Sequence, residues 1–565
     1  MDSDSDYQPE TDVDSSDDEV WELIDSSDDS DDENIPPNST LNATQPNVTV
    51  NYGYDVLDTM PEAPASFLPE RVPGIQLDQV RTRDSAKQYF RAIDFFKLYF
   101  TMDIVLQICQ YTNTYATEHG LQKPSVFQSW YELSPDEFYR FCGLIMYAGI
   151  VQVPNIERFW STKSLYNGLW ARAFMSRDRF KAIMCFIKVS NPLTEDPNDK
   201  LCKVRMLTTY IRMKCIKLYQ PHQNVSIDER MVRNKGKYAF RQYIRDKPTK
   251  WGMKLWILAD SLSGYTYDFD IYLGKQQDNG PFGLAYGVVM KLTKSISRQG
   301  YRLFFDKFYT SVQLLKDLWF IGIGACGTVL RTRKGFPNAI KDVKNFEKKS
   351  KRGDMRWIRD GQLLTVQWRD NKTISLMSTI HDANDSVTAK RQTKTNGQFE
   401  NLTVNQPTIV HDYNKYMGGV DKSDQLINKY NVLRKTNKYW KTIFFHMLDI
   451  ARVNSYILFQ DWRDKNKDVP ELKRPTRYGQ LNFTEELIRE LGDIGIDDPV
   501  PIASKPPVHF KHAMDPQFMD KRGNCKLCYS NEKIVRRTSV KCKVCDVFLC
   551  FQKERNCLSQ YHKLL

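Results

Sequence analysis

The spacing of apolar residues changes near residue 250, and this change constrains the fold more than any other feature of the chain. Before it, stretches such as AIDFFKLYFTMDIVLQICQ (92–110) repeat apolar residues every three or four positions, which predicts amphipathic helices. After it, KLWILAD (254–260) is a continuous apolar run and YTYDFDIYLG (265–274) alternates, so the two predict a β-hairpin. A third apolar run, YRLFFD (301–306), precedes a predicted helix and another strand. A mixed α/β domain therefore follows a helical region.

A chain of 565 residues exceeds one compact core, so we predict a multidomain protein that combines α/β and α+β organisation. The boundaries follow shifts in composition and hydrophobic period. The predicted segments are an acidic disordered tail (1–84), a helical region (85–250), an α/β core (251–330), a β-rich insertion (331–405), the second part of the core (406–445), a second helical region (446–495), a linker (496–523) and a cysteine-rich domain (524–565).

Charge is distributed very unevenly along the chain. Residues 1–70 contain 20 Asp and Glu and no Lys or Arg, and their Ser-Asp-Asp steps suit phosphorylation by an acid-directed kinase. The remaining chain carries all 81 basic residues against 49 acidic ones, a net charge of +32. A folded region this basic favours a polyanionic partner, and nucleic acid is the commonest one. A lysine-rich surface that serves only solubility is the alternative.

Targeting signals and membrane spans are not evident. The chain has no apolar run of about 18 residues, and its first residues are acidic rather than basic and then apolar. We therefore expect an intracellular protein without a membrane-spanning segment. In that compartment, scattered cysteines are expected to be small core residues. Six are of this kind: Cys109, Cys142, Cys185, Cys202, Cys215 and Cys326.

Three aspartates stand at the ends of predicted elements. Asp260 and Asp306 each close an apolar strand, and Asp421 follows Gly418-Gly419 at the start of a predicted helix, with Asp424 three residues later. Carboxylates in such positions suit two Mg²⁺ ions in a nucleotidyl-transfer site, because hard cations prefer oxygen ligands. The alternatives are ordinary turn residues for the first two and helix capping for the other pair.

The last 41 residues contain a second candidate metal site. Two Cys-x2-Cys knuckles are followed by two more cysteines and a histidine, a spacing typical of zinc sites and unlike a disulfide framework in an intracellular chain. The candidate ligands are Cys525, Cys528, Cys542, Cys545, Cys550, Cys557 and His562.

Seven ligands fall one short of two closed zinc sites. His509 or His512 could supply the eighth, and a water molecule or another group is an equal alternative. In an interleaved cross-brace, Cys525 and Cys528 would share an ion with Cys550. Cys542 and Cys545 would then share the second with Cys557 and His562. A RING- or PHD-type zinc module is the alternative interpretation of this segment.

Several long stretches resemble the piggyBac family of DNA transposases, over about residues 85–565. They are SIDERMV followed by KYAFRQYIRDKPTKWGMKLWILAD, then YRLFFDKFYTSVQLL, and then HDYNKYMGGVDKSDQLINKYNVLRKTNKYWKTIFFHMLDIARVNSY. The resemblance implies an RNase H-like catalytic core, with Asp260, Asp306 and Asp421 as the catalytic triad and Asp424 as an accessory acid.

The same resemblance implies cut-and-paste transposition by metal-dependent hydrolysis and strand transfer, with insertion at TTAA sites. It further implies a nuclear homodimer whose two helical regions grip double-stranded DNA. The cysteine-rich domain would recognise the transposon ends, and its basic stretch KIVRRTSVKCK suits phosphate contact.

One residue departs from the family pattern. The family usually places Asn directly after the second aspartate, whereas Lys307 follows Asp306 here. A cation that faces a metal-binding carboxylate weakens the site by repulsion, but strand alternation predicts that Lys307 points to the opposite face. The alternative function is therefore a domesticated, transposase-derived DNA-binding protein that does not cut DNA.

Overall fold

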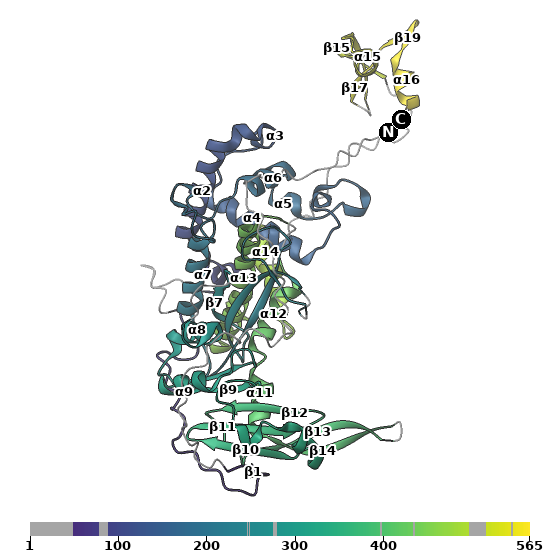
Figure 1. Ribbon diagram of the computed structural model, residues 1–565. Coiled ribbons are helices and arrows are strands. Elements are labelled where there is room, and N and C mark those ends of the chain that lie inside the picture. The colour runs from purple at the N-terminus through teal and green to yellow at the C-terminus, as the bar shows by residue number, and fades with distance from the viewer. Residues whose placement is uncertain are drawn as a thin grey trace. The chain divides into compact units, whose positions relative to one another are not determined.

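A computed structural model describes residues 49–77, 89–245, 247, 249–274, 280–395, 398–432, 436–495, 516–543 and 546–564 (Figure 1). They fall into two compact units, Met1–Val153 with Phe174–Asp497 and Pro154–Ala173 with Asp498–Leu565. Among the described helices, none is both long and apolar enough to cross a membrane. The predictions that lie outside these residues concern the acidic segment 1–48 with its kinase sites, most of the linker, His509, His512 and Cys545.

 

A ten-stranded sheet forms the centre of the first unit (Figure 1). Its middle strands lie in the order β7-β6-β4-β8-β9, and of these only β6 runs opposite to the rest, because it pairs antiparallel with both β4 and β7. β4 pairs parallel with β8, and β8 pairs parallel with β9. The bounds are β4 (Asn224–Arg233), β5 (Gln242–Tyr243), β6 (Trp251–Asp260), β7 (Thr266–Ile271), β8 (Arg302–Phe305) and β9 (Gly324–Thr328).

The β-rich insertion continues this sheet beyond β9. Its strands β12 (Thr373–Ser378), β11 (Leu363–Arg369) and β10 (Met355–Asp360) follow β9 in antiparallel order. A second hairpin, β13 (Ser386–Thr395) with β14 (Gln398–Pro407), projects beside them in Figure 1. Trp357 and Trp368 are buried in a hydrophobic core between these strands and the hairpin. Val404 of β14 packs into the same cluster.

Helices cover the sheet and build the segment that precedes it. The longest, α13 (Tyr439–Lys465), is buried along most of its length and is held to β7 by Asn454, whose side chain bonds both the amide and the carbonyl of Thr266. The other helices are α1 (Ala92–Phe96), α2 (Met102–His119), α3 (Pro124–Phe127), α4 (Pro135–Ile150), α5 (Ala171–Phe174), α6 (Arg177–Phe186), α7 (Arg205–Leu218), α8 (Gly283–Thr293), α9 (Val312–Phe320), α10 (Val343–Lys349), α11 (Thr408–Tyr416), α12 (Gly419–Lys429) and α14 (Gln480–Gly492).

The predicted helical region 85–250 is wrong in about its last fifth. α7 ends at Leu218, and residues 219–243 form β3 (Tyr219–Gln220), β4 and β5. Within NVSIDERMVR (224–233), the first five residues alternate between polar and apolar side chains, which is the period of a half-buried strand. Strand β4 therefore belongs to the central sheet.

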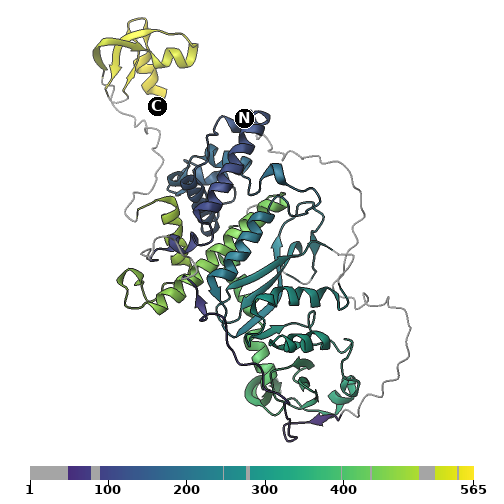
Figure 2. The same ribbon diagram turned by 90° about the vertical axis from the view of Figure 1, so that its left-hand side faces the viewer.

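The predicted disordered tail is also too long, because residues 49–77 pack along the first unit (Figure 2). β1 (Asn51–Tyr52) pairs with β10, and Asp58 forms a buried ion pair with Arg359 at 2.6 Å. Further along, β2 (Gly74–Ile75) pairs with β3, and the amide of Ile75 donates to Asp461 of α13. We call residues 49–77 the strap. It was missed because it has little apolar periodicity and is held by polar contacts.

The described part of the cysteine-rich module already includes residues 516–523, which were predicted to be linker. Its first strand, β15, pairs with β16 from Pro516 onward, opposite Cys542. Its elements are β15 (Pro516–Asn524), α15 (Lys526–Glu532), β16 (Arg537–Cys542), β17 (Val547–Phe548), β18 (Phe551–Gln552), β19 (Arg555–Asn556) and α16 (Cys557–Leu564).

Candidate active site and metal centre

Asp306 follows the last residue of β8, and the sheet register places Asp228 beside it. The last parallel pair between β4 and β8 joins Ile227 to Phe305, so the next residues on the two strands are Asp228 and Asp306. The carboxyl end of a parallel strand is the edge where α/β proteins place their functional groups. β8 ends here, whereas β4 continues to Arg233, so Asp228 lies in the middle of β4 beside this edge. We call this edge the carboxylate end.

Three acidic side chains crowd the carboxylate end. The pKa of Asp228 is raised to about 8, chiefly by burial and then by the charge of the neighbouring Glu229 carboxylate. Burial and then the charge of Glu229 also raise the pKa of Asp306. Burial opposes ionisation of Glu229 as well, but its ion pair with Lys254, at 3.2 Å, helps to hold its pKa below the usual value. Carboxylates that disfavour one another's charge are stabilised by a shared cation.

Helix α12 brings the other two predicted carboxylates over β4. Asp424 pairs with Arg230, which lies two residues after Asp228 and hence on the same face of β4. Asp421 is exposed in the first turn of α12. The N-cap is Gly418, and no side chain caps this helix, so the capping alternative for the two aspartates is wrong.

The start of α12 lies close against the sheet. A Cβ atom on Gly419 would lie 2.6 Å from Ser226 Oγ and 3.0 Å from the Cα of Ser261, so glycine is required for this approach. Among the described residues, no three of the acidic oxygens lie within 4.8 Å of one another. The structure thus brings Asp228 and Asp306 side by side and places the α12 acids over the same strand.

Asp260 lies at the opposite end of the sheet, so its predicted place beside Asp306 is wrong. β6 runs antiparallel to β4, and Asp260 pairs with Val225, which in turn pairs with Leu303 of β8. Asp260 is therefore three residues along the strands and two strands across the sheet from Asp306. This offset places their Cα atoms roughly 14 Å apart. A strand that ends in aspartate reaches the carboxylate end only if it runs in the right direction.

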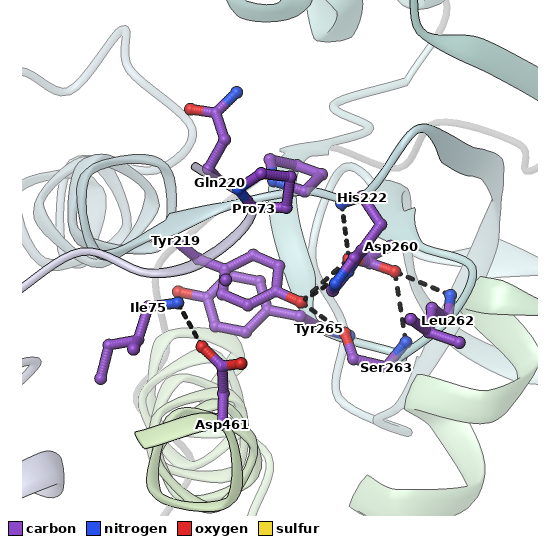
Figure 3. Close-up of polar contacts among 12 residues, drawn as sticks. Pro73, Ile75, Tyr219, Gln220, His222, Asp260, Leu262, Ser263, Tyr265 and Asp461 are labelled. Carbon is purple, nitrogen blue, oxygen red and sulfur yellow. Dashed lines mark hydrogen bonds and ion pairs between the residues drawn. The ribbon is translucent and has the colours of Figure 1, made fainter. Parts of the chain in front are cut away.

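The Asp260 carboxylate is 0% exposed and fully engaged in hydrogen bonds (Figure 3). Its Oδ1 accepts from the amides of Leu262 and Ser263, at 2.7 and 3.2 Å. Its Oδ2 accepts from the Tyr219 hydroxyl at 2.9 Å and from the His222 amide at 3.0 Å, and lies 2.8 Å from His222 Nδ1. The turn interpretation of Asp260 therefore holds, and its oxygens are not available to an ion.

Protonation reinforces this structural role. Burial alone would raise the pKa of Asp260, but the hydrogen bonds and charge of His222 lower it below the usual value. The same hydrogen bond raises the pKa of His222. The two side chains thus favour the charged pair.

Asp228 is the site residue that sequence reasoning missed. It belongs to the SIDER stretch that was compared with the family but assigned to the helical region. The available signal was the polar–apolar alternation of residues 224–228, which ends at the acidic pair Asp228-Glu229. Its pairing partner, however, depends on a parallel contact across 78 positions that no local pattern reveals.

The zinc candidate is supported by four cysteines. The Sγ atoms of Cys525, Cys528, Cys550 and Cys557 all lie within 4.8 Å of one another, and all four residues are buried. Two of the separations, from Cys528 to Cys557 and to Cys550, are 3.5 and 4.0 Å. Four thiolates about 2.3 Å from a tetrahedral zinc ion would be about 3.8 Å apart.

This grouping corrects the predicted pairing, because Cys557 joins the first knuckle rather than Cys542 and His562. Cys557 begins α16, which directs its thiol toward the start of α15, where Cys525 is the N-cap. Cys542 is buried in the same module. His562 Nδ1 lies 2.6 Å from the Leu558 carbonyl. Cys545 lies outside the described residues, so the second zinc site stays a prediction.

Comparison with known proteins now gives the chain a family. A family model described as Transposase IS4 matches residues 91–456, more than half of the chain. Among curated proteins, human PiggyBac transposable element-derived protein 3 is 27% identical over 472 residues, which cover 82% of this chain and 75% of that protein. The chain belongs to the piggyBac transposase family.

Other members agree with this assignment. Human PiggyBac transposable element-derived protein 2 is 28% identical over 388 residues, which cover 66% of this chain and 62% of that protein. A piggyBac transposase, solved as a synaptic complex with hairpin DNA, matches 85% of this chain and 98% of its own with a TM-score of 0.63 and 24% identity. That likeness shows that the two chains share a fold.

The departure from the piggyBac pattern lies on the surface. Lys307 is exposed in the turn after β8, and its carbonyl accepts from Arg333 at 3.1 Å. The Lys307 charge acts to lower the pKa of Asp306, although the opposing effect of burial is larger. Lys307 is therefore close enough to influence the carboxylate end.

Proposed function

We propose that this chain is a metal-dependent DNA transposase whose catalytic carboxylates are Asp228, Asp306 and Asp421, with Asp424 in support. The observation that carries the proposal is the parallel register that sets Asp228 beside Asp306 at one end of the sheet. The strand order β7-β6-β4-β8-β9, with only β6 reversed, supports an RNase H-like core.

The residues present suit Mg²⁺. Asp228 and Asp306 offer carboxylate oxygens in a partly buried setting where burial and the charge of Glu229 make their ionisation unfavourable without a cation. When bound, divalent ions activate the attacking oxygen and stabilise the leaving oxygen of a phosphodiester. The chain itself orients these carboxylates: β4 and β8 fix two of them, and Arg230 holds Asp424 over the same strand.

The finer features of the proposal follow the family. We include cut-and-paste excision, insertion at TTAA sites, action as a homodimer and a nuclear location. The piggyBac structure with the shared fold is a complex with hairpin DNA, which supports double-stranded DNA as the partner. The four clustered cysteines support a zinc module that contacts the transposon ends.

A second candidate is a DNA-binding protein without cleavage activity. It is favoured by the human relatives, which are described as derived from transposable elements, and by Lys307 beside Asp306. Both candidates share the basic charge and the zinc module, and they differ only in whether the carboxylate end is catalytic.

An excision assay separates the two. A donor plasmid would carry the terminal repeats that flank the gene, and excision would be scored for wild type, Asp228→Ala and Asp306→Ala. Wild-type excision that both variants lose supports the transposase. Excision by wild type no greater than by the variants, with end binding retained, supports the second candidate.

The zinc part of the proposal has its own test. Native mass spectrometry of the full chain should show at least one bound zinc, and Cys528→Ser should remove one equivalent. Two zinc ions in wild type would support the second site with Cys542 and His562. A chain that carries no zinc would overturn the assignment of the cysteines.

A further inference from the structure

A pocket of about 740 Å³ lies in the first unit, between the segment after α3 and the starts of α4 and α6. It shares no residue with the carboxylate end. Its lining includes Trp130, Tyr131 and Arg179, and also the N-cap residues Ser134 and Ser176 of the two helices. A volume of this size suits a small organic group.

Tyr131 forms a fixed aromatic platform at this pocket. The Arg179 guanidinium lies 3.5 Å from the centre of its ring, and the Tyr131 hydroxyl donates to Glu137 Oε1 at 2.8 Å. Despite these two contacts the residue is 60% exposed. The ring is therefore held in position while much of its surface stays open for stacking.

Arg179 supplies an unused hydrogen-bond donor. It is 3% exposed, and its Nε and Nη2 both donate to the Glu137 carboxylate, the first at 2.7 Å. Its Nη1 is buried without an acceptor among the described residues. A buried donor without a partner is costly, so this atom points to an acceptor that a bound molecule would bring.

Charge selects the kind of molecule. The pocket is lined by two acids, Asp136 and Glu137, and by two arginines, Arg140 and Arg179, whose formal charges cancel. A phosphate would favour a net positive site. A flat neutral ring with carbonyl and amino groups fits better, because it can stack on Tyr131, accept from Nη1 and donate to a carboxylate.

We propose that this pocket takes a single base of bound DNA that has been turned out of the helical stack. The inference rests on the DNA binding proposed above and adds a site outside the carboxylate end. Unstacking a base costs free energy, and stacking on an aromatic side chain offsets part of this cost. The pocket would favour DNA in which one base is already unpaired.

Fluorescence anisotropy with three duplexes of one sequence tests this. One is fully paired, one carries a single unpaired thymine, and one carries an abasic residue at the same bulge. We expect the thymine bulge to bind at least about fivefold more tightly than the other two. Tyr131→Ala should remove this preference, and Tyr131→Phe, which keeps the ring, should retain it.

Tyr52→Ala is the matched control, because Tyr52 is 58% exposed and lies on β1, outside the pocket. It should leave the preference unchanged. Equal affinity for the three duplexes, or a preference that survives Tyr131→Ala, would overturn the base pocket while leaving DNA binding intact. Failure to bind any duplex would overturn the proposed DNA-binding function and the pocket with it.

Discussion

The two ends of the central sheet both present aspartates, but in opposite chemical states. Asp260 is buried, and its oxygens accept hydrogen bonds from two backbone amides of its own turn and from Tyr219 and His222. Asp228 and Asp306 instead lie beside Glu229, which with burial raises the pKa of both. One end satisfies its carboxylate with protein groups, and the other leaves carboxylates that a cation would stabilise.

This difference separates a structural acid from the acids that we propose are catalytic. A carboxylate with all its hydrogen bonds made contributes to stability and offers nothing to a ligand. Crowded carboxylates cost stability, and such costs are typical of functional sites. Each variant below changes one end and leaves the other as its control.

The largest expected effect is on DNA cleavage. Asp228→Asn and Asp306→Asn should each reduce excision by at least about a thousandfold, because a lost metal ligand removes several kcal/mol of transition-state stabilisation. Asp260→Asn should retain activity per folded molecule. Excision of the plasmid donor, normalised to folded protein, measures this. Full activity of Asp228→Asn together with an inactive, folded Asp260→Asn would reverse the assignment.

The next largest effect is on stability, and here the substitution of Asp260 rather than of Asp228 should cause the loss. Asp260→Ala should lower the free energy of unfolding by about 3–5 kcal/mol, because it leaves His222, Tyr219 and two amides without their buried partner. Asp228→Asn should be nearly neutral, because burial and Glu229 raise the pKa of Asp228 to about 8, so the side chain that the amide replaces is largely uncharged near pH 7 when no metal is bound. Denaturant unfolding followed by tryptophan fluorescence would show the contrast. Equal losses in the two variants would contradict it.

The sequence predicted the elements of this site better than their arrangement. The hairpin at 254–274, the strand that ends at Asp306 and the helix that carries Asp421 and Asp424 all lie where the apolar patterns placed them. Local spacing decides which residues form a strand, since it reports which side chains must be buried. It does not report strand direction within the sheet.

Direction explains the error at Asp260. Two strands that each end in aspartate look equivalent in sequence, yet β6 returns antiparallel from its turn while β8 runs parallel to β4. The strap was missed for a related reason. Contacts such as Asp58 with Arg359 join residues 301 positions apart, and no local signal marks either partner.

A smaller effect is expected from divalent cations. Mn²⁺ at about tenfold over its dissociation constant should stabilise the chain by about 1.4 kcal/mol. Asp306→Asn should abolish this stabilisation, whereas Asp260→Asn should keep it. Residues 516–565 contain no tryptophan, so thermal unfolding followed by tryptophan fluorescence reports on the rest of the chain. An undiminished response in Asp306→Asn would place the ion elsewhere.

The smallest effect is a pH dependence at the Asp260 end. His222 faces Asp260, Asp461, Lys465 and the Tyr219 hydroxyl, and its hydrogen bond to Asp260 raises its pKa above 6.5. A group whose pKa rises on folding contributes its full stabilisation of the fold at pH values below its unfolded pKa. This stabilisation is lost as the pH rises through the pKa of the folded state.

The Asp260 pKa is lowered, so its contribution is present above about 3.8 and is lost as pH falls further. The charged pair of His222 and Asp260 therefore stabilises the fold most between about pH 3.8 and about pH 6.5. His222→Asn should lower the melting temperature more at about pH 6 than at about pH 8.5, by only a degree or two because His222 is 37% exposed. The same comparison in Asp421→Asn should follow wild type, because that variant changes an exposed side chain and leaves His222 and Asp260 paired. A loss in His222→Asn that is the same at both pH values would show that the imidazole acts only through packing.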